Sequence, residues 1–141
     1  MRTWSVVVLA LLLATAFTMT APDRVIGVIG SGDFDEMDPR PLAAPDTVQA
    51  GSTFDVEVTT IGPNMCWSAA DAKVTYDGHK VTIVPYDYVE EGACAQAIVR
   101  PSRTVELQFD TPGEATIRVQ GRATRHDEDI TSEVSTTVVV E

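Results

Sequence analysis

Cysteine and histidine are scarce in this sequence, with two of each among 141 residues. A structural zinc site takes three or four ligands that usually come in close pairs, and neither the cysteines nor His79 and His126 form such a pair. Cys66 and Cys94 also lie too far apart for the C-x-x-C spacing that lowers a thiol pKa in redox sites. We therefore expect neither a zinc centre nor a redox-active thiol.

Catalytic motifs are missing as well. The sequence has no G-x-S-x-G or H-E-x-x-H, and the run Gly27–Gly32 lacks the Lys-Ser/Thr ending of a phosphate-binding loop. Either histidine could serve as a base, but neither lies near a distinctive serine. A carboxylate pair for glycoside hydrolysis carries little weight, because 21 acidic residues always allow some pair. We expect no enzymatic activity and no cofactor.

Basic residues are few, since 10 Lys and Arg stand against 21 Asp and Glu and the formal net charge is −11. A polyanion of this size is repelled by nucleic acid and by anionic membrane surfaces, so neither is an expected partner. The acidic residues are spread along the chain, which is typical of a solvated surface. The length suits one domain with a modest core.

No apolar run reaches the roughly 20 residues that span a bilayer. The run Val6–Leu13 follows Arg2 and precedes the small-x-small site Ala14–Ala16, which is the pattern of a cleavable export signal. Residues 1–16 are therefore expected to be a signal peptide, with Ala21 as a later second cleavage site. No cysteine follows the run to carry a lipid, so the expected mature protein is secreted or periplasmic and has no stable membrane anchor.

Residues 17–41 are rich in Gly, Pro and Asp and predict a flexible tether, with at most a short edge strand at Val25–Ile29. Calcium binds several carboxylate oxygens from one short loop, so the tether also carries a candidate calcium site. The EF-hand spacing is absent, and a solvated tether explains the same acidic residues. The candidate ligands are Asp33, Asp35, Glu36 and Asp38.

From Leu42 onward, apolar residues alternate with polar ones, which is the pattern of half-buried strands. Turn signals rich in Gly, Pro and Asp separate the runs, and no window outside the export signal shows a convincing helical period. Residues 42–141 therefore predict an all-β, antiparallel sandwich of about seven strands. The alternating runs are STFDVEVTT, AKVTY, KVTIVPYDY, RTVELQF, EATIRVQGRAT and SEVSTTVVV.

Three positions carry local expectations. The run KVTIVPYDY fits two registers, with either Val81 or Val84 pointing inward. Pro85 has no N–H to donate to a ladder, so it predicts an edge strand or a strand end at that point. Gly121 interrupts its run and predicts a bulge.

Two stretches resemble bacterial immunoglobulin-like domains. APDTVQAGSTFDVEVTTIG is similar to their opening, with a Pro-led first strand, an AG turn and an F-x-V-x-V strand, and TPGEATIRVQGR is similar to their late G-x-A-x-I-x-V strand. The resemblance implies a bacterial source, an immunoglobulin-like sandwich, and a partner that is a protein or glycan of the cell envelope. Trp67 directly follows Cys66, which departs from the antibody pattern, so the resemblance does not place the disulfide.

An even number of cysteines in an exported chain favours one disulfide, between Cys66 and Cys94. Trp67 is then either an apolar lid against that bond or an exposed anchor for a partner. Together with Tyr86 and Tyr88, which precede the second cysteine, it is a candidate partner contact. We expect a non-enzymatic binding or structural module. The alternatives are a small secreted enzyme or enzyme inhibitor that uses loops at one end, and a calcium-binding module that uses the tether.

Overall fold

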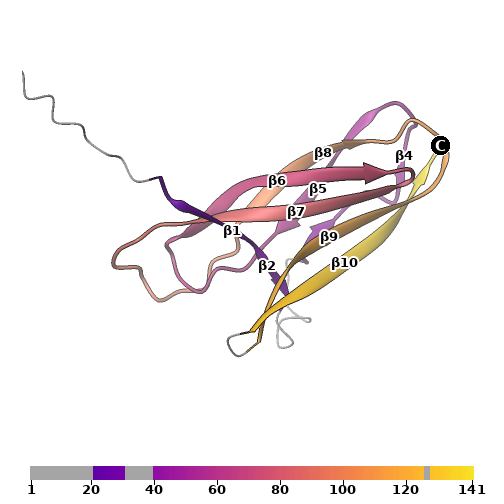
Figure 1. Ribbon diagram of the computed structural model, residues 1–141. Coiled ribbons are helices and arrows are strands. Elements are labelled where there is room, and N and C mark those ends of the chain that lie inside the picture. The colour runs from indigo at the N-terminus through magenta and orange to yellow at the C-terminus, as the bar shows by residue number, and fades with distance from the viewer. Residues whose placement is uncertain (1–20, 31–39, 126–127) are drawn as a thin grey trace, which may run out of the picture.

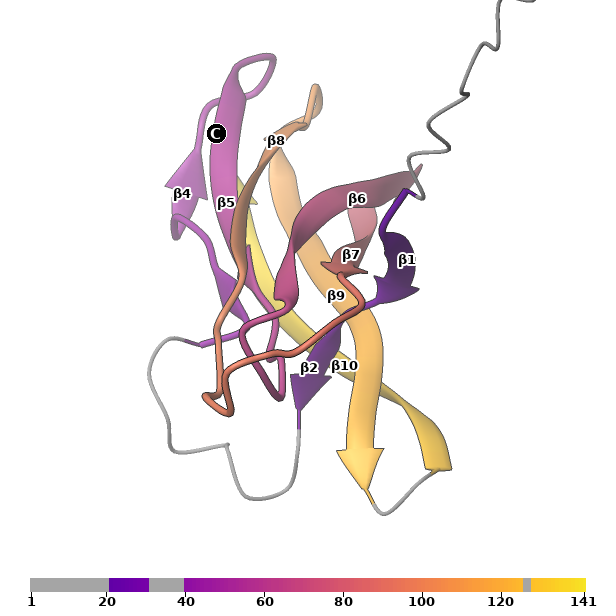
Figure 2. The same ribbon diagram turned by 90° about the vertical axis from the view of Figure 1, so that its left-hand side faces the viewer.

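The computed structural model describes residues 21–30, 40–125 and 128–141, which form ten strands in two facing sheets (Figure 1, Figure 2). No helix occurs within these ranges, and hence none that could cross a membrane. The expected all-β sandwich and its disulfide are confirmed. The larger sheet contains β1 (Asp23–Ile26), β2 (Val28–Gly30), β4 (Thr47–Val48), β6 (Trp67–Asp77), β7 (Lys80–Val89), β9 (Gly113–Arg125) and β10 (Glu128–Val140). The smaller sheet contains β3 (Leu42–Ala43), β5 (Thr53–Thr59) and β8 (Ser102–Gln108).

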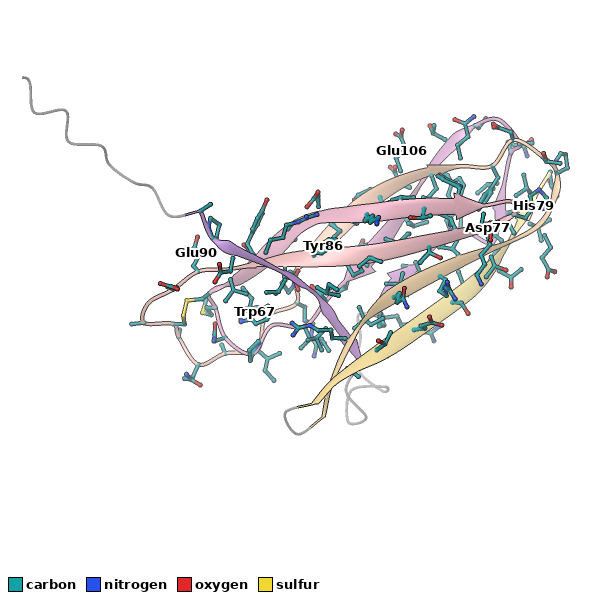
Figure 3. The ribbon with its side chains drawn as sticks, viewed as in Figure 1. Trp67, Asp77, His79, Tyr86, Glu90 and Glu106 are labelled. Carbon is teal, nitrogen blue, oxygen red and sulfur yellow. A yellow bond between two sulfur atoms is a disulfide. The ribbon has the colours of Figure 1, made fainter. Side chains whose placement is uncertain are left out.

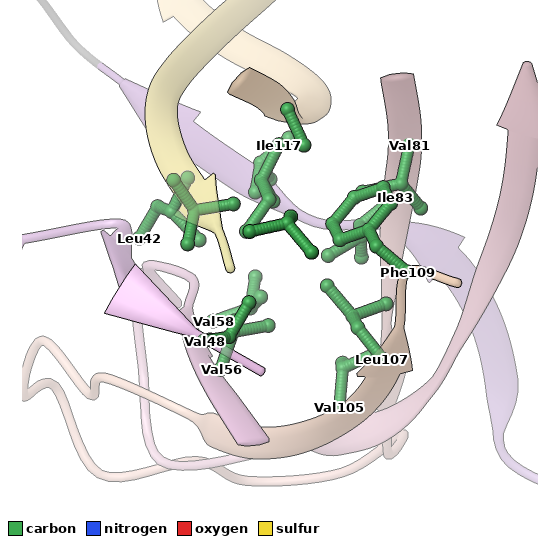
Figure 4. Packing of buried hydrophobic residues seen from close by; sticks show 14 of the residues in the cluster. Leu42, Val48, Val56, Val58, Val81, Ile83, Val105, Leu107, Phe109 and Ile117 are labelled. Carbon is green, nitrogen blue, oxygen red and sulfur yellow. The ribbon is translucent and has the colours of Figure 1, made fainter. Parts of the chain in front are cut away.

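The core lies between the two sheets, where the inward side chains of both sheets meet (Figure 4). On β7 the residues Val81, Ile83 and Pro85 are buried while their neighbours are partly exposed, which decides between the two registers that the sequence allows. Each fully buried Val, Leu or Ile stabilises the fold by roughly 1.5 to 3 kcal/mol. The other fully buried core residues include Val56, Val58, Leu107, Ala115, Ile117, Val119 and Val138.

The larger sheet is mixed, which corrects the expected antiparallel arrangement. Strand β7 runs parallel to β9, β4 runs parallel to β10, and β2 pairs in parallel with the end of β9. Between β7 and β9 the chain crosses to the smaller sheet and forms β8, and such a crossover is what parallel neighbours require. The alternating sequence pattern reports which side chains are buried and carries no information about strand direction.

The segment 23–30 belongs to the packed domain, which corrects the tether and the domain boundary expected at Leu42. Strand β1 pairs with the far half of β7, and β2 pairs with β9 where β7 and β9 have separated. Ile29 is part of the core cluster, with 2% of its surface exposed. These two strands, with the two-residue strands β3 and β4, explain why the structure has more strands than the seven expected.

Pro85 and Gly121 mark the place where β1 and β2 enter the sheet. Pro85 lies inside a strand with neighbours on both sides, contrary to the expected edge, but it sits where β7 changes partner from β9 to β1 and opposite a register shift in β6. Its missing N–H therefore costs no ladder bond. The β9–β10 register is continuous through Gly121, so the expected bulge is absent there. A Cβ on Gly121 would lie 2.7 Å from the carbonyl oxygen of Gly27, so glycine is required by close backbone approach.

Candidate functional site

The disulfide joins two loops at one end of the sandwich. Cys66, just before β6, is bonded to Cys94, in the loop between β7 and β8, and their Cα atoms are 5.5 Å apart. Backbone hydrogen bonds hold the same two loops together, because the amides of Gly62 and Val99 donate to each other's carbonyl oxygens at 2.9 and 3.0 Å. The Met65 amide donates to the Ala95 carbonyl at 3.1 Å. We call residues 61–66 and 92–99 the clamped loops.

Trp67 is half-buried and closes this end of the sandwich (Figure 3). It lies opposite Val89 in the β6–β7 ladder, so it points to the inner side of the sheet, the side of the buried Asp87. A Cβ on Gly62 would lie only 2.5 Å from the Trp67 Cβ, so the indole side chain rests directly on that glycine. This is the placement of an apolar lid, and it leaves part of the indole accessible.

Tyr86 and Tyr88 lie on the other face of β7. Tyr88 is opposite Ser68 and Arg24, and Tyr86 is opposite Ile26. The Arg24 guanidinium stands 3.8 Å above the centre of the Tyr86 ring, an arrangement that favours cation–π attraction. The three predicted partner contacts therefore do not form one patch, because Trp67 faces inward and the two tyrosines face outward.

The clamped loops expose apolar and uncharged surface. Met65 and Ile98 are 61% and 56% exposed, and the three alanines at 93, 95 and 97 are exposed as well. Residues 58–70 and 92–99 contain no Asp, Glu, Lys or Arg. Because the whole chain carries a formal charge of −11, an uncharged surface of this kind is unusual for it. Ile98 is not among the predicted partner contacts, and the two charge-free runs joined by the disulfide are the sequence signal that could have found it.

A buried ionic network lies nearby, between the two sheets. The Arg103 guanidinium is 2.6 Å from Asp87 Oδ1, and their side chains are 7% and 0% exposed. Thr60 donates its hydroxyl to the same carboxylate oxygen at 2.8 Å. Burial raises the pKa of Asp87, and the hydrogen bond from Thr60 and the charge of Arg103 oppose that rise only in part. The network was not predicted, although the inward register of Val81 and Ile83 already turns Asp87 toward the core.

The histidines and the calcium candidates named from the sequence are not part of the clamped loops. His79 lines a hollow at the end of the sandwich opposite the disulfide. Asp110, which was not predicted, lines the same hollow, but no hydrogen bond joins the two side chains in the described part of the chain. His126 and the calcium candidates Asp33, Asp35, Glu36 and Asp38 lie outside the described residues. Among the residues that the structure describes, no three His, Cys, Asp or Glu side chains are grouped to hold a metal ion.

Comparison with known proteins gives no family. No family model, no curated protein and no solved structure matches the chain. The function must therefore be argued from the surface chemistry of the sandwich, because a fold alone does not imply a function.

Proposed function

We propose that this protein is a non-enzymatic binding or structural module, secreted or periplasmic, whose partner is a protein or glycan of the cell envelope. The observation that carries the proposal is the clamped loops, which present exposed Met65 and Ile98 on uncharged surface. Scattered apolar side chains are common on protein surfaces, but apolar side chains gathered on charge-free loops are typical of the centre of an interface.

Rigidity supports the same proposal. The disulfide and the paired backbone hydrogen bonds fix both loops before any partner arrives. A preordered surface loses little conformational entropy on association, so more of the contact energy remains as affinity. Glu90 and Glu91 are exposed where the second loop begins, and carboxylates at the rim of an apolar surface favour a partner with positive charge around its own contact region.

The compartment and the fold family are part of the proposal. A disulfide is consistent with an oxidising compartment, and the signal peptide expected at residues 1–16 would deliver the chain there. The immunoglobulin-like assignment is supported by the first strands of the sandwich, since β3 pairs with β5 in one sheet and β4 pairs with β10 in the other. The parallel β7–β9 pair is a departure from that pattern.

A binding comparison tests the proposal. The mature protein is immobilised and exposed to envelope extract alongside the variant Met65→Ser/Ile98→Ser and the control Val139→Ser, which changes an exposed apolar residue on β10. We expect the wild type and the Val139 control to retain the same envelope component and the double variant to lose it. If all three proteins retained the component equally, the binding surface would lie outside the clamped loops.

A further inference from the structure

A shallow hollow opens at the end of the sandwich opposite the disulfide. It lies between the turn that joins β6 to β7 and the loop after β8, and its volume is about 440 Å³. Figure 3 shows His79 and Asp77 at this end, far from Trp67. The hollow therefore belongs to a different surface from the clamped loops.

Tyr76 provides an aromatic wall of the hollow. Tyr76 is the second-last residue of β6, pairs with Val81 of β7, and is 48% exposed. Its hydroxyl oxygen accepts the backbone N–H of Gln108 at 3.1 Å. Its ring meets the ring of Phe109 edge to face, with the centroids 6.1 Å apart. The ring is thus held at both ends in one orientation, with part of its surface open to solvent.

Two polar side chains, Gln108 and Asp110, line the hollow together with this ring and are hydrogen-bonded to each other. The Gln108 side-chain amide donates to Asp110 Oδ1 at 2.7 Å, which orients the carboxylate and the amide together. That bond uses one carboxylate oxygen and one amide hydrogen. The second carboxylate oxygen, the amide oxygen and the Tyr76 hydroxyl proton take part in no hydrogen bond among the described residues. They are available to a ligand as two acceptors and one donor.

We infer that this hollow binds a neutral saccharide. A pyranose ring has an apolar C–H face that packs on an aromatic ring, and hydroxyl groups around its edge that both donate and accept hydrogen bonds. Tyr76 supplies the ring and a hydroxyl donor, and the Gln108–Asp110 pair supplies two acceptor oxygens beside it. A few oriented polar groups next to aromatic surface are the usual composition of a small-molecule site. The Asp110 carboxylate and the chain's net charge of −11 disfavour anionic sugars.

The side chains of Gln108 and Asp110 take no part in the core cluster, and the Tyr76 ring contacts it through Phe109. Phe109 is 3% exposed and stacks on Phe54, so these two rings already close the apolar core at this end. Tyr76, Gln108 and Asp110 lie outside that contact and are exposed. The inference concerns different residues from those of the proposed function, so the failure of one would leave the other unaffected.

Amide chemical shifts of the intact mature protein test the inference. Cellobiose, maltose and N,N′-diacetylchitobiose are the neutral probes, and glucuronic acid is the anionic comparison. At least one neutral disaccharide is expected to shift the amides of residues 76–80 and 108–113 at millimolar concentration and to leave those of residues 62–66 and 92–99 unchanged. If none of the three shifts the first group, or if glucuronic acid binds as well as the best of them, the inference is overturned.

Variants identify the groups that bind. Tyr76→Ala and Asp110→Ala are each expected to weaken the affinity at least about tenfold, whereas Glu106→Ala, which removes an exposed carboxylate from β8 outside the hollow, should leave it unchanged. Tyr76→Phe keeps the ring in case Tyr76→Ala fails to fold, and it is expected to weaken binding by a smaller factor. Affinity that survives both Tyr76→Ala and Asp110→Ala in folded protein would contradict the assignment, and Met65→Ser/Ile98→Ser should have no effect on it.

Discussion

Replacing Arg103 with methionine should destabilise this protein strongly. The change removes the counter-charge that lies 2.6 Å from Asp87 Oδ1 and leaves a carboxylate whose side chain is 0% exposed. Breaking a buried ion pair in this way costs about 3 to 5 kcal/mol at neutral pH. A domain of this size has a total stability of roughly 5 to 15 kcal/mol, so the variant would lose a large part of it.

Replacing Asp87 with asparagine should cost much less. Burial raises the pKa of Asp87, so the folded protein accepts a neutral group at this position more readily than the unfolded chain does. Asparagine still offers an oxygen to Thr60 and Arg103, and the Arg103 guanidinium keeps its hydrogen bonds to the carbonyl oxygens of Tyr86 and Pro101. We therefore expect a smaller loss than that of Arg103→Met. Adding Asp87→Asn to Arg103→Met removes the unpaired charge, and the double variant should recover at least about 2 kcal/mol relative to Arg103→Met.

Urea unfolding of the four proteins at pH 7, followed by circular dichroism and tryptophan fluorescence, measures this cycle. The reasoning is refuted if Asp87→Asn alone costs as much as Arg103→Met, because the charged carboxylate would then be favoured by the fold. It is also refuted if the two changes are additive, since that would mean that the ion pair has no coupling energy.

Three further predictions concern the same end of the molecule. Replacing Cys66 and Cys94 with serine should lower the free energy of unfolding by about 3.6 kcal/mol, the chain-entropy value for residues 28 positions apart, and a loss under about 1 kcal/mol by urea titration would show that the clamp is dispensable. Trp67→Ala should cost about 2 kcal/mol, less than the 3 to 5 of a fully buried tryptophan, and thermal unfolding at the wild-type temperature would count against its role as a lid. Because burial raises the pKa of Asp87, its stabilising contribution is complete below the unfolded-state value of about 3.9 and is lost as the pH rises through the folded-state pKa. The stability of the wild type relative to Asp87→Asn should therefore increase on acidification, and a difference that is constant between neutral and acidic pH would contradict this sign.

The strands of the sandwich could be predicted because apolar and polar residues alternate along a strand that has one buried side. Val105 and Leu107 on β8, and Ile117 and Val119 on β9, were placed inward from that pattern and are buried in the core. The disulfide could be predicted from two cysteines and the expectation of an export signal. These features depend on local sequence and on composition.

The entry of residues 23–30 into the sheet could not be predicted, because it depends on a gap between two distant strands. Ile29 fills the space where β7 and β9 separate, and only the three-dimensional structure shows that space. Gly121 is glycine because the backbone of Gly27 passes close to it, and sequence alone suggested a bulge at that position. The parallel β7–β9 pair was missed for a related reason, since alternation is the same in both strand directions.

The candidate site was predicted in part. The sequence placed Trp67 beside the disulfide and left its direction open, and the β6–β7 register turns it inward, away from Tyr86 and Tyr88. Ile98 could not be predicted as a partner contact, because an isolated isoleucine in a loop belongs to no sequence motif. Its significance appears only when the disulfide brings its charge-free loop against that of Met65.

Site-specific photocrosslinking in the living source cell tests the clamped loops most directly as the binding surface. A photoreactive phenylalanine is placed at Met65, at Ile98 or, as a control, at Val139, all of which are exposed. We predict that the first two positions yield the same discrete adduct with an envelope component and that the control yields none. Adducts from Val139 with none from Met65 or Ile98 would contradict the assignment of the clamped loops.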